Sequence, residues 1–249
     1  NLRGELIGIN TAIYSQSGGN IGIGFAIPVN MARQVMTQLV AHGEVKRGYL
    51  GAQLQDMNQE LAEAFGLSGS HGAVVVDIAP DSPAARSGLA PGDVITHYND
   101  KPVANAAELR TQIGLTRSGD QVDLTYLRDG ASGHAMVKLS TRDTATTAGT
   151  APGSGGGRSF KNERLAQTTL GEIPQDSPAY GRIDGIMVYK VERGSRAWQA
   201  GLRAGDVISS VNRTATPSMP AFLAVVNAAK GELVLRVHRG MQSAYLVIK

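Results

Sequence analysis

Two short glycine-rich patterns near the start of the chain could do chemistry. Ser17-Gly18-Gly19 is a setting in which a serine can act as a nucleophile, and Gly22-x-Gly24 could form a loop that cradles a phosphate. The simplest alternative is a turn that joins two strands. The choice among these interpretations decides whether the chain carries a catalytic residue.

A nucleophilic serine needs a histidine base, an acid that orients the base, and an oxyanion hole. The sequence places no histidine against Ser17, because each one belongs to an expected helix end or lies in or beside an expected strand. We therefore expect no catalytic residue in this chain. The histidines are His42, His71, His97, His134 and His238.

A dinucleotide-binding loop needs a third glycine and a helix that begins directly after it. The chain instead continues Phe25-Ala26-Ile27-Pro28, with Ile27 where the glycine is needed. The segment is therefore expected to be a hairpin, with strands over residues 5–13 and 21–27.

Composition removes further classes of function. The 249 residues include no cysteine, which excludes disulfides, thiolate metal sites and a cysteine nucleophile. No group of His, Asp and Glu has metal-ligand spacing, so no metal or other cofactor is implied. The net charge of +3 comes without a basic run interleaved with aromatic residues, so we expect no nucleic-acid binding. No apolar run is long enough to predict a membrane span.

A polar stretch divides the chain. Residues 141–161 read TRDTATTAGTAPGSGGGRSFK, and the near absence of large apolar side chains predicts a flexible linker. A repeat lies on either side of it: residues 72–99 and 185–212 align without a gap, and eleven of these 28 positions are identical. We expect four segments, over residues 1–45, 46–142, 143–161 and 162–249, of which the third is the linker.

Each repeat is expected to be mainly β with short helices. In the first copy, alternating β-branched residues predict strands, and Asn105 with Glu108 forms a capping box that begins a helix. The expected strands cover residues 73–78, 94–98, 121–128 and 134–139, with a short helix over 82–87 and a longer one from 106.

Two aspartates in the repeats could be mistaken for catalytic groups. Asp93 and Asp206 both lie in a shared Gly-Asp-Val-Ile motif, where we expect them to accept hydrogen bonds from turn N–H groups. Trp198, the only tryptophan, could lie in the core of the second copy or form an exposed contact for another subunit, and we favour the core.

Residues 1–45 are too few to form a core of their own. Asn30 is expected to cap a helix that ends at Gly43 and has one apolar stripe. Because two strands and a helix are too little for independent stability, we expect this segment to be the end of a larger domain. The stripe consists of Ala32, Val35, Met36, Leu39 and Val40.

The chain closely resembles the bacterial HtrA (Deg) serine proteases. The resemblance is carried by NLRGELIGINTAI, GGNIGIGFAIPVNMARQVMTQL and GEVKRGYLGAQL, and by both repeats, which are similar to the PDZ domains of those proteases. It implies that residues 1–45 are the end of a chymotrypsin-like double β-barrel followed by two PDZ domains. It also implies that the catalytic His, Asp and Ser precede residue 1, so this chain alone is expected to be inactive.

The same resemblance implies a cellular role. HtrA proteases are endopeptidases of the bacterial periplasm that degrade misfolded envelope proteins under stress, and they assemble from trimers. We accordingly expect misfolded polypeptides and hydrophobic C-terminal peptides as partners, and a trimer-based homo-oligomer for the full-length protein.

The resemblance gives the opening hairpin a function. Three residues of the first strand would pair with the substrate backbone, and three apolar side chains of the second would form a pocket floor that prefers small or medium aliphatic residues. Each of these apolar side chains could equally fill the core of the barrel. The implied substrate-pocket residues are Thr11, Ala12, Ile13, Ile21, Ile23 and Phe25.

The first repeat contains the pattern of a PDZ carboxylate-binding loop in residues 47–52, RGYLGA. Leu50, Gly51 and Ala52 would donate backbone N–H groups, while Arg47 would either attract the carboxylate or be an exposed linker cation. The predicted peptide-binding residues are Arg47, Tyr49, Leu50, Gly51, Ala52, Leu54, Leu109 and Ile113. In the second repeat Gln167 stands where the first has Gly51, which puts carboxylate capture there in doubt.

Two classes of function follow. The leading hypothesis is part of an HtrA-type serine endopeptidase that supplies the substrate-pocket wall and PDZ peptide capture. The alternative is a non-enzymatic tandem-PDZ adaptor or chaperone. A Gly-Asn-Ser-Gly-Gly sequence encoded just before Asn1, with His and Asp further upstream, would favour the protease.

Overall fold

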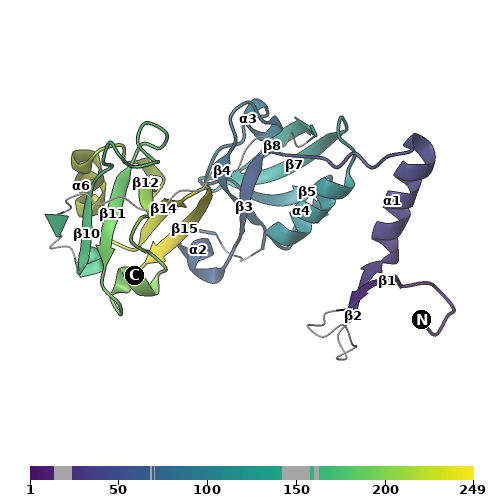
Figure 1. The fold of residues 1–249 in the computed structure, drawn as a ribbon, viewed down its shortest axis with the longest axis horizontal. Helices are drawn as coiled ribbons and strands as arrows, with labels where there is room; N and C mark the ends of the chain where they lie inside the picture. Colours follow the sequence, from purple (N-terminus) through teal and green to yellow (C-terminus); the bar gives the residue numbers. More distant parts are fainter. Residues whose placement is uncertain (14–23, 68, 70, 142–157, 160–162) are drawn as a thin grey trace.

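The computed structural model describes residues 1–13, 24–67, 69, 71–141, 158–159 and 163–249. These residues form three antiparallel sheets with short helices between their strands, which confirms the mainly β fold (Figure 1). The first sheet is a hairpin, and the other two each belong to a compact body with its own hydrophobic core. Among the described residues, no helix is long and apolar enough to cross a membrane.

The amino-terminal hairpin and helix lie at one end of the molecule (Figure 1). Strand β1 (Gly8–Ile13) pairs with β2 (Gly24–Pro28), and helix α1 (Val29–His42) follows directly. The expected cap at Asn30 is wrong, because the helix begins two residues earlier than that cap implies, with Pro28 as its N-cap, and no side chain accepts a bond there. The end at Gly43, which adopts φ 74°, is as expected.

Helix α1 buries none of its residues. Two hydrogen bonds connect it to the next body: one from Gln38 to the carbonyl of Leu115 (2.9 Å) and one between Arg117 and His42 (3.1 Å). The expected apolar stripe is therefore present but largely uncovered by the described residues, with Val40 84% exposed.

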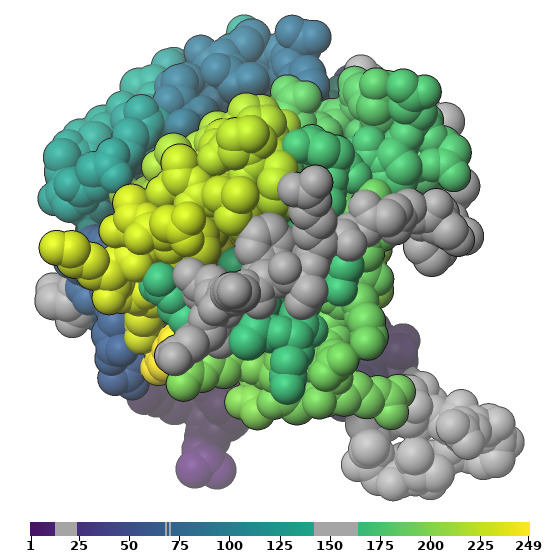
Figure 2. Space-filling view, turned by 90° about the vertical axis from the view of Figure 1, so that its left-hand side faces the viewer, coloured from purple at the N-terminus to yellow at the C-terminus, as the bar shows by residue number. Residues whose placement is uncertain are grey.

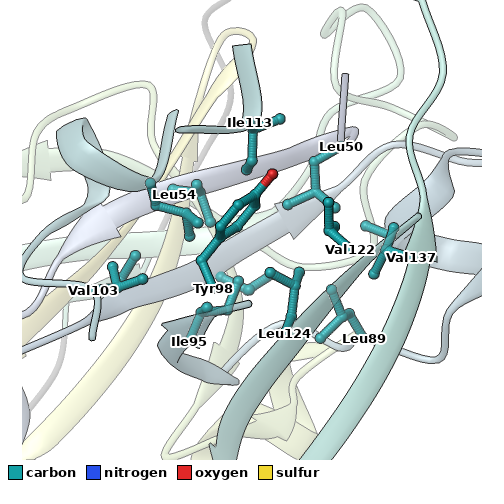
Figure 3. Packing of buried hydrophobic residues seen from close by; sticks show 14 of the residues in the cluster. Leu50, Leu54, Leu89, Ile95, Tyr98, Val103, Ile113, Val122, Leu124 and Val137 are labelled. Atoms are coloured by element: carbon teal, nitrogen blue, oxygen red, sulfur yellow. The ribbon is translucent and has the colours of Figure 1, made fainter. Parts of the chain in front are cut away.

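The first body is a six-stranded sheet in which β3 is the end strand next to β4. Its core contains Leu109 together with Leu50, Leu54 and Ile113, and the last three lie around the ring of Tyr98 (Figure 3). The predicted cap of the helix over residues 106–115 forms, since Asn105 accepts from the N–H of Glu108 (2.8 Å), but the Glu108 carboxylate accepts from the N–H of Ala104 (2.9 Å) rather than from that of Asn105. The elements are β3 (Ala52–Asp56), α2 (Gln59–Ala64), β4 (Ala73–Ile78), α3 (Pro83–Arg86), β5 (Val94–Tyr98), β6 (Lys101–Pro102), α4 (Ala106–Leu115), β7 (Gln121–Arg128) and β8 (Ala131–Lys138).

The second body repeats this plan in a seven-stranded sheet with the order β15-β14-β12-β11-β10-β9, with β13 beside β12. Figure 2 views the molecule from the end that carries β10, with the greens and yellows of this body in front of the blue and teal of the first. Its elements are β9 (Arg158–Ser159), a 3-10 turn (Glu163–Leu165), β10 (Thr168–Glu172), β11 (Ile186–Val191), α5 (Arg196–Gln199), β12 (Val207–Val211), β13 (Thr214–Ala215), α6 (Met219–Ala228), β14 (Leu233–Arg239) and β15 (Gln242–Ile248).

The repeat aspartates hold the same turn in both bodies. Asp93 accepts from the N–H of Ala90 (2.7 Å), as predicted, and also forms a two-point ion pair with Arg128 (2.6 and 2.7 Å). Asp206 does the same with Arg239 (2.6 and 2.7 Å). Both aspartates are fully buried, and their bond to the guanidinium raises the pKa of each arginine above its ordinary value. Both carboxylates therefore hold the fold together.

The expectation that Trp198 belongs to the core is wrong. Its side chain is half-buried, and the guanidinium of Arg203 lies 4.4 Å from the centre of its ring. A planar cation can stack on the indole only where that face of the ring is accessible, so this tryptophan covers the core from outside.

The two bodies pack against each other through α2, β3 and β4 on one side and β14 and β15 on the other. The rings of Phe65 and Tyr245 meet edge to face with centroids 5.6 Å apart. Arg236 of the second body pairs with Asp77 of the first (2.6 Å), and Arg213 pairs with Asp129. The contact therefore combines an aromatic centre with ion pairs.

Two glutamines of β3 cover the outer edge of β15. Gln53 donates to the carbonyl of Met241 and accepts from the N–H of Ser243 (2.9 Å each). Gln55 donates to the carbonyl of Tyr245 (3.1 Å) and accepts from its N–H (2.8 Å). Because β15 ends its sheet, these amides satisfy backbone groups that would otherwise need water or another strand.

Candidate functional site

The loop before β3 presents unpaired backbone donors. The carbonyl of Leu50 accepts from the N–H of Ala84 (2.9 Å), and that of Gly51 accepts from the N–H of Ala79 (2.8 Å). Within the described part of the chain, the N–H groups of Leu50 and Gly51 have no hydrogen-bond acceptor. Two adjacent donors with their carbonyls held elsewhere suit an anionic ligand such as a carboxylate.

Only glycine fits the centre of this loop. Gly51 has φ 79°, and a Cβ added there would lie 2.1 Å from the Cβ of Ser82. Ser82 cannot easily move away, because its hydroxyl caps α3 by accepting from the N–H of Ala85 (3.2 Å). The tight packing of the loop on α3 thus fixes where its N–H groups point.

Strand β3 offers the edge next to this loop. Gly51 and Gln53 face β4, where they pair with Ala79 and Asp77. Because backbone direction alternates along a strand, Ala52 and Leu54 direct their backbone groups to the open edge. The two predicted residues therefore stand where an added peptide strand would pair.

One side chain that the sequence reasoning missed lies on this edge. Arg110 of α4 donates from its guanidinium to the carbonyl of Leu54. No local sequence pattern could have found it, because its bonding partner lies 56 positions away along the chain. Among the described residues, Arg110 is the hydrogen-bond partner of this outward carbonyl.

The predicted apolar residues of the groove gather in one cluster. Leu50, Leu54, Leu109 and Ile113 are all at most 7% exposed and belong to one cluster, and Ala52 is half-buried against it. Leu50, Leu54 and Ile113 lie around Tyr98 (Figure 3). The Tyr98 hydroxyl bonds Thr116, and burial raises the pKa of the phenol above its ordinary value. The cluster is part of the buried core, and we expect its side toward β3 and α4 to be the apolar floor of a peptide groove.

Arg47 and Tyr49 do not join this cluster. Arg47 is exposed and makes an isolated backbone bridge with Arg117, while Tyr49 pairs with Ser140 through both backbone groups (2.7 and 3.2 Å). Both therefore position the loop through the main chain.

The implied substrate-pocket residues are only partly described. Ala12 lies opposite Phe25 in the hairpin, and the Thr11 hydroxyl donates to the carbonyl of Phe25 (3.3 Å). The Phe25 side chain is 55% exposed and Ile13 is the last described residue of β1. Ser17, Ile21 and Ile23 lie outside the described residues. Within the described ranges, no His, Asp and Glu side chains gather in a group that could hold a metal ion.

The second body has a counterpart of the loop with different chemistry. Gln167 adopts φ 62° where the first body has Gly51, so a side chain accepts the left-handed conformation there. Arg164 donates to the carbonyls of Val226 (3.4 Å) and Ala229 (2.8 Å) at the end of α6. In the first body the equivalent carbonyls are those of Ile113 and Thr116, and they pack directly on Gly48. The N–H of Gly48 donates to the carbonyl of Thr116 (2.8 Å).

Comparison with known domains agrees with this geometry. The PDZ domain family matches residues 48–139, and a second PDZ domain family matches residues 187–239. The chain therefore carries two PDZ domains in tandem, which we call the first and second PDZ domain.

Relatives of known name extend the match to the whole chain. The periplasmic pH-dependent serine endoprotease DegQ of Escherichia coli (strain K12) is 40% identical over 100% of this chain and 52% of its own length. A probable periplasmic serine protease do/HhoA-like of Haemophilus influenzae is 38% identical over 100% of this chain and 50% of its own. The solved HtrA-type protease AlgW with decapeptide is 42% identical over 57% of this chain and 44% of its own, with a TM-score of 0.46.

The chain belongs to the HtrA (Deg) family of serine proteases. It spans about half the length of the curated relatives it matches.

Proposed function

We propose that the chain is the substrate-recruiting part of a periplasmic HtrA-type serine endopeptidase that degrades misfolded envelope proteins. Its first PDZ domain captures hydrophobic C-termini: the loop N–H groups hold the carboxylate, β3 pairs with the peptide backbone, and the apolar floor takes the side chains. The observation that carries the proposal is the pair of unpaired donors at Leu50 and Gly51, next to an open strand edge.

Residues 1–45 would serve the protease active site. In this proposal Thr11, Ala12 and Ile13 pair with the substrate backbone, and Ile21, Ile23 and Phe25 line the pocket for a small or medium aliphatic side chain. Large apolar side chains of this segment remain exposed on the hairpin and on α1, which supports burial against further protease-domain structure. They are Leu2, Leu6, Ile7, Ile9, Phe25, Ile27, Met36, Leu39 and Val40.

Peptide capture can be tested with this chain directly. A decapeptide ending in Leu-Val is titrated by calorimetry, once with a free carboxylate and once as its C-terminal amide. We expect binding to the acid and at least tenfold weaker binding to the amide, because the amide removes the charge that the loop recognises. Equal affinity for both peptides would contradict carboxylate capture.

The protease assignment needs a separate test. The chain alone is expected to leave unfolded casein intact, and cleavage that a serine-hydrolase probe blocks would overturn this. The coding sequence before Asn1 is expected to contain Gly-Asn-Ser-Gly-Gly preceded by His and Asp. A different residue in place of that serine would favour the tandem-PDZ adaptor, and a trimer-based assembly of the full-length protein would support the protease.

A further inference from the structure

The peptide-binding edge of the second PDZ domain is not open. Strand β10 lies between β11 and the short strand β9, which comes from the segment between the two domains. The pairing is antiparallel, with Thr169 opposite Ser159 and Leu170 opposite Arg158. In the first PDZ domain, β3 ends its sheet among the described residues.

The register shows that β10 is the counterpart of β3. Thr168 pairs with Val191 of β11 as Ala52 pairs with Ile78 of β4. The carbonyl of Gln167 accepts from the next strand (N–H of Glu192, 3.0 Å), as that of Gly51 does in the first domain. Strand β9 therefore occupies the edge that corresponds to the open edge of β3.

The backbone groups at this edge point toward β9. Val188, opposite Leu170, uses both its backbone groups on the far side, donating to the carbonyl of Asp206 and accepting from the N–H of Gly205 (2.8 Å each). Leu170 consequently directs its own N–H and carbonyl outward, to Arg158. Its counterpart in the first domain is Leu54, at the position where a captured peptide would pair.

We propose that residues 158–159 are an internal ligand of the second PDZ domain. The segment adds to β10 as a C-terminal peptide would and so closes this domain to external peptides. External peptides are then bound by the first PDZ domain. This inference rests on the PDZ assignment and not on protease activity.

Tethering makes such a ligand effective despite its short pairing. A segment held on the same chain acts at an effective concentration on the order of millimolar. An external peptide binds only the open fraction of molecules, so a domain that is nine-tenths closed binds about tenfold more weakly than its open form. Releasing β9 should therefore strengthen peptide binding to the second domain about tenfold.

The first experiment locks the segment in place. Because the chain has no cysteine, Ser159→Cys with Thr169→Cys introduces a single pair. These residues face each other without exchanging backbone bonds, a geometry with Cα atoms about 4.5 Å apart that a disulfide can bridge. We expect the disulfide to form within one chain under mild oxidation. The matched control, Thr147→Cys with Thr169→Cys, should cross-link far more slowly, and equal rates would overturn the proposal.

The second experiment releases the segment. Arg158→Pro removes the N–H opposite Leu170, and Thr147→Pro is the control with the same substitution elsewhere in the linker. By NMR of the labelled chain, we expect the Leu170 amide to exchange at least tenfold faster in Arg158→Pro alone. The decapeptide ending in Leu-Val should then bind at Leu170 about tenfold more tightly in Arg158→Pro than in the unmodified chain. Its affinity for the cysteine pair variant in the reduced state serves as a folded reference.

Two results would overturn the proposal. One is unchanged Leu170 exchange in Arg158→Pro, and the other is peptide binding at Leu170 that is equally strong in the unmodified and released chains. Shifts at Leu54 report the first PDZ domain in the same spectra, so failure of the proposed peptide capture there would be seen separately.

Discussion

At the scale of single residues, the buried carboxylates of Asp93 and Asp206 form structural bonds within their own domains. Each accepts a turn N–H and a two-point arginine bond in an almost dry setting. Removal of one partner from a buried pair leaves the other unsatisfied, which costs more than the pair itself contributes.

Asp93→Asn should therefore destabilise the first PDZ domain by about 2 kcal/mol, below the ~3–5 kcal/mol of a fully buried pair because Arg128 is 40% exposed. Urea unfolding followed by circular dichroism measures the loss. Asp129→Asn, which changes an exposed carboxylate paired with Arg213, is the matched control and should cost less than about 1 kcal/mol. Similar losses in both variants would contradict the structural role of Asp93.

The conformation of Gly51 gives a second prediction at this scale. Gly51→Ala should cost about 3 kcal/mol or more and abolish peptide binding, because the new Cβ meets Ser82 in addition to the strain of φ 79°. Gly88 has nearly the same φ, 77°, with nothing within 4 Å of an added Cβ. Gly88→Ala should cost only about 1–2 kcal/mol and leave binding intact. Calorimetry and urea unfolding of both variants separate steric conflict from backbone strain.

Residue-level predictions from sequence succeeded where the cause is local. The turn role of Asp93 and the cap at Asn105 depend on neighbours within a few positions, so the pattern contains them. The partners Arg128 and Arg110 reach across 35 and 56 positions, and no local pattern determines where a long side chain ends. The missed functional residue of the groove belongs to this second kind.

At the scale of elements, the proposed peptide groove of the first PDZ domain lies between β3 and α4, which Arg110 connects through its bond to the carbonyl of Leu54. A peptide that pairs with Leu54 must displace the guanidinium from its carbonyl. Arg110 is largely exposed, so this bond is worth about 1 kcal/mol rather than the ~1.5–3 kcal/mol of a buried charged bond.

Arg110→Ala should therefore strengthen binding of the free-carboxylate decapeptide about fivefold, measured by calorimetry. Thr111→Ala, at the next and exposed position of α4, is the control and should leave affinity unchanged. Weaker binding in Arg110→Ala would show instead that the guanidinium contacts the peptide.

At the scale of the whole molecule, the contact between the domains was not predictable from the repeat pattern. It uses Gln53 and Gln55, whose sequence pattern is that of ordinary outward-facing residues of a strand. It also uses Tyr245, which lies 190 positions from its partner Gln55. Sequence patterns identify which faces are apolar, and here a polar edge and one aromatic pair decide how two similar domains meet.

His238 makes this contact sensitive to pH. Its imidazole bonds Ser209 and Ser243 (2.8 Å each), and Ser243 donates to Asp77 of the first domain (3.1 Å). Burial, followed by the nearby Arg236, lowers the pKa of His238 below its ordinary 6.5, while Asp77 acts in the opposite direction. The folded protein therefore holds this ring neutral at pH values where the unfolded chain is already protonated.

Because the unfolded state binds more protons, the free energy of unfolding should fall as the pH drops below about 6.5, with a slope of at most about 1.4 kcal/mol per pH unit from this group. Above that pH, protonation of His238 should not change the free energy of unfolding. Urea unfolding of the unmodified chain and of His238→Gln between pH 7.5 and 5.5 measures the difference in slope. His71→Gln, which changes an exposed histidine, should retain the full slope, and a His238→Gln slope equal to that of the unmodified chain would show that other groups cause the acid sensitivity.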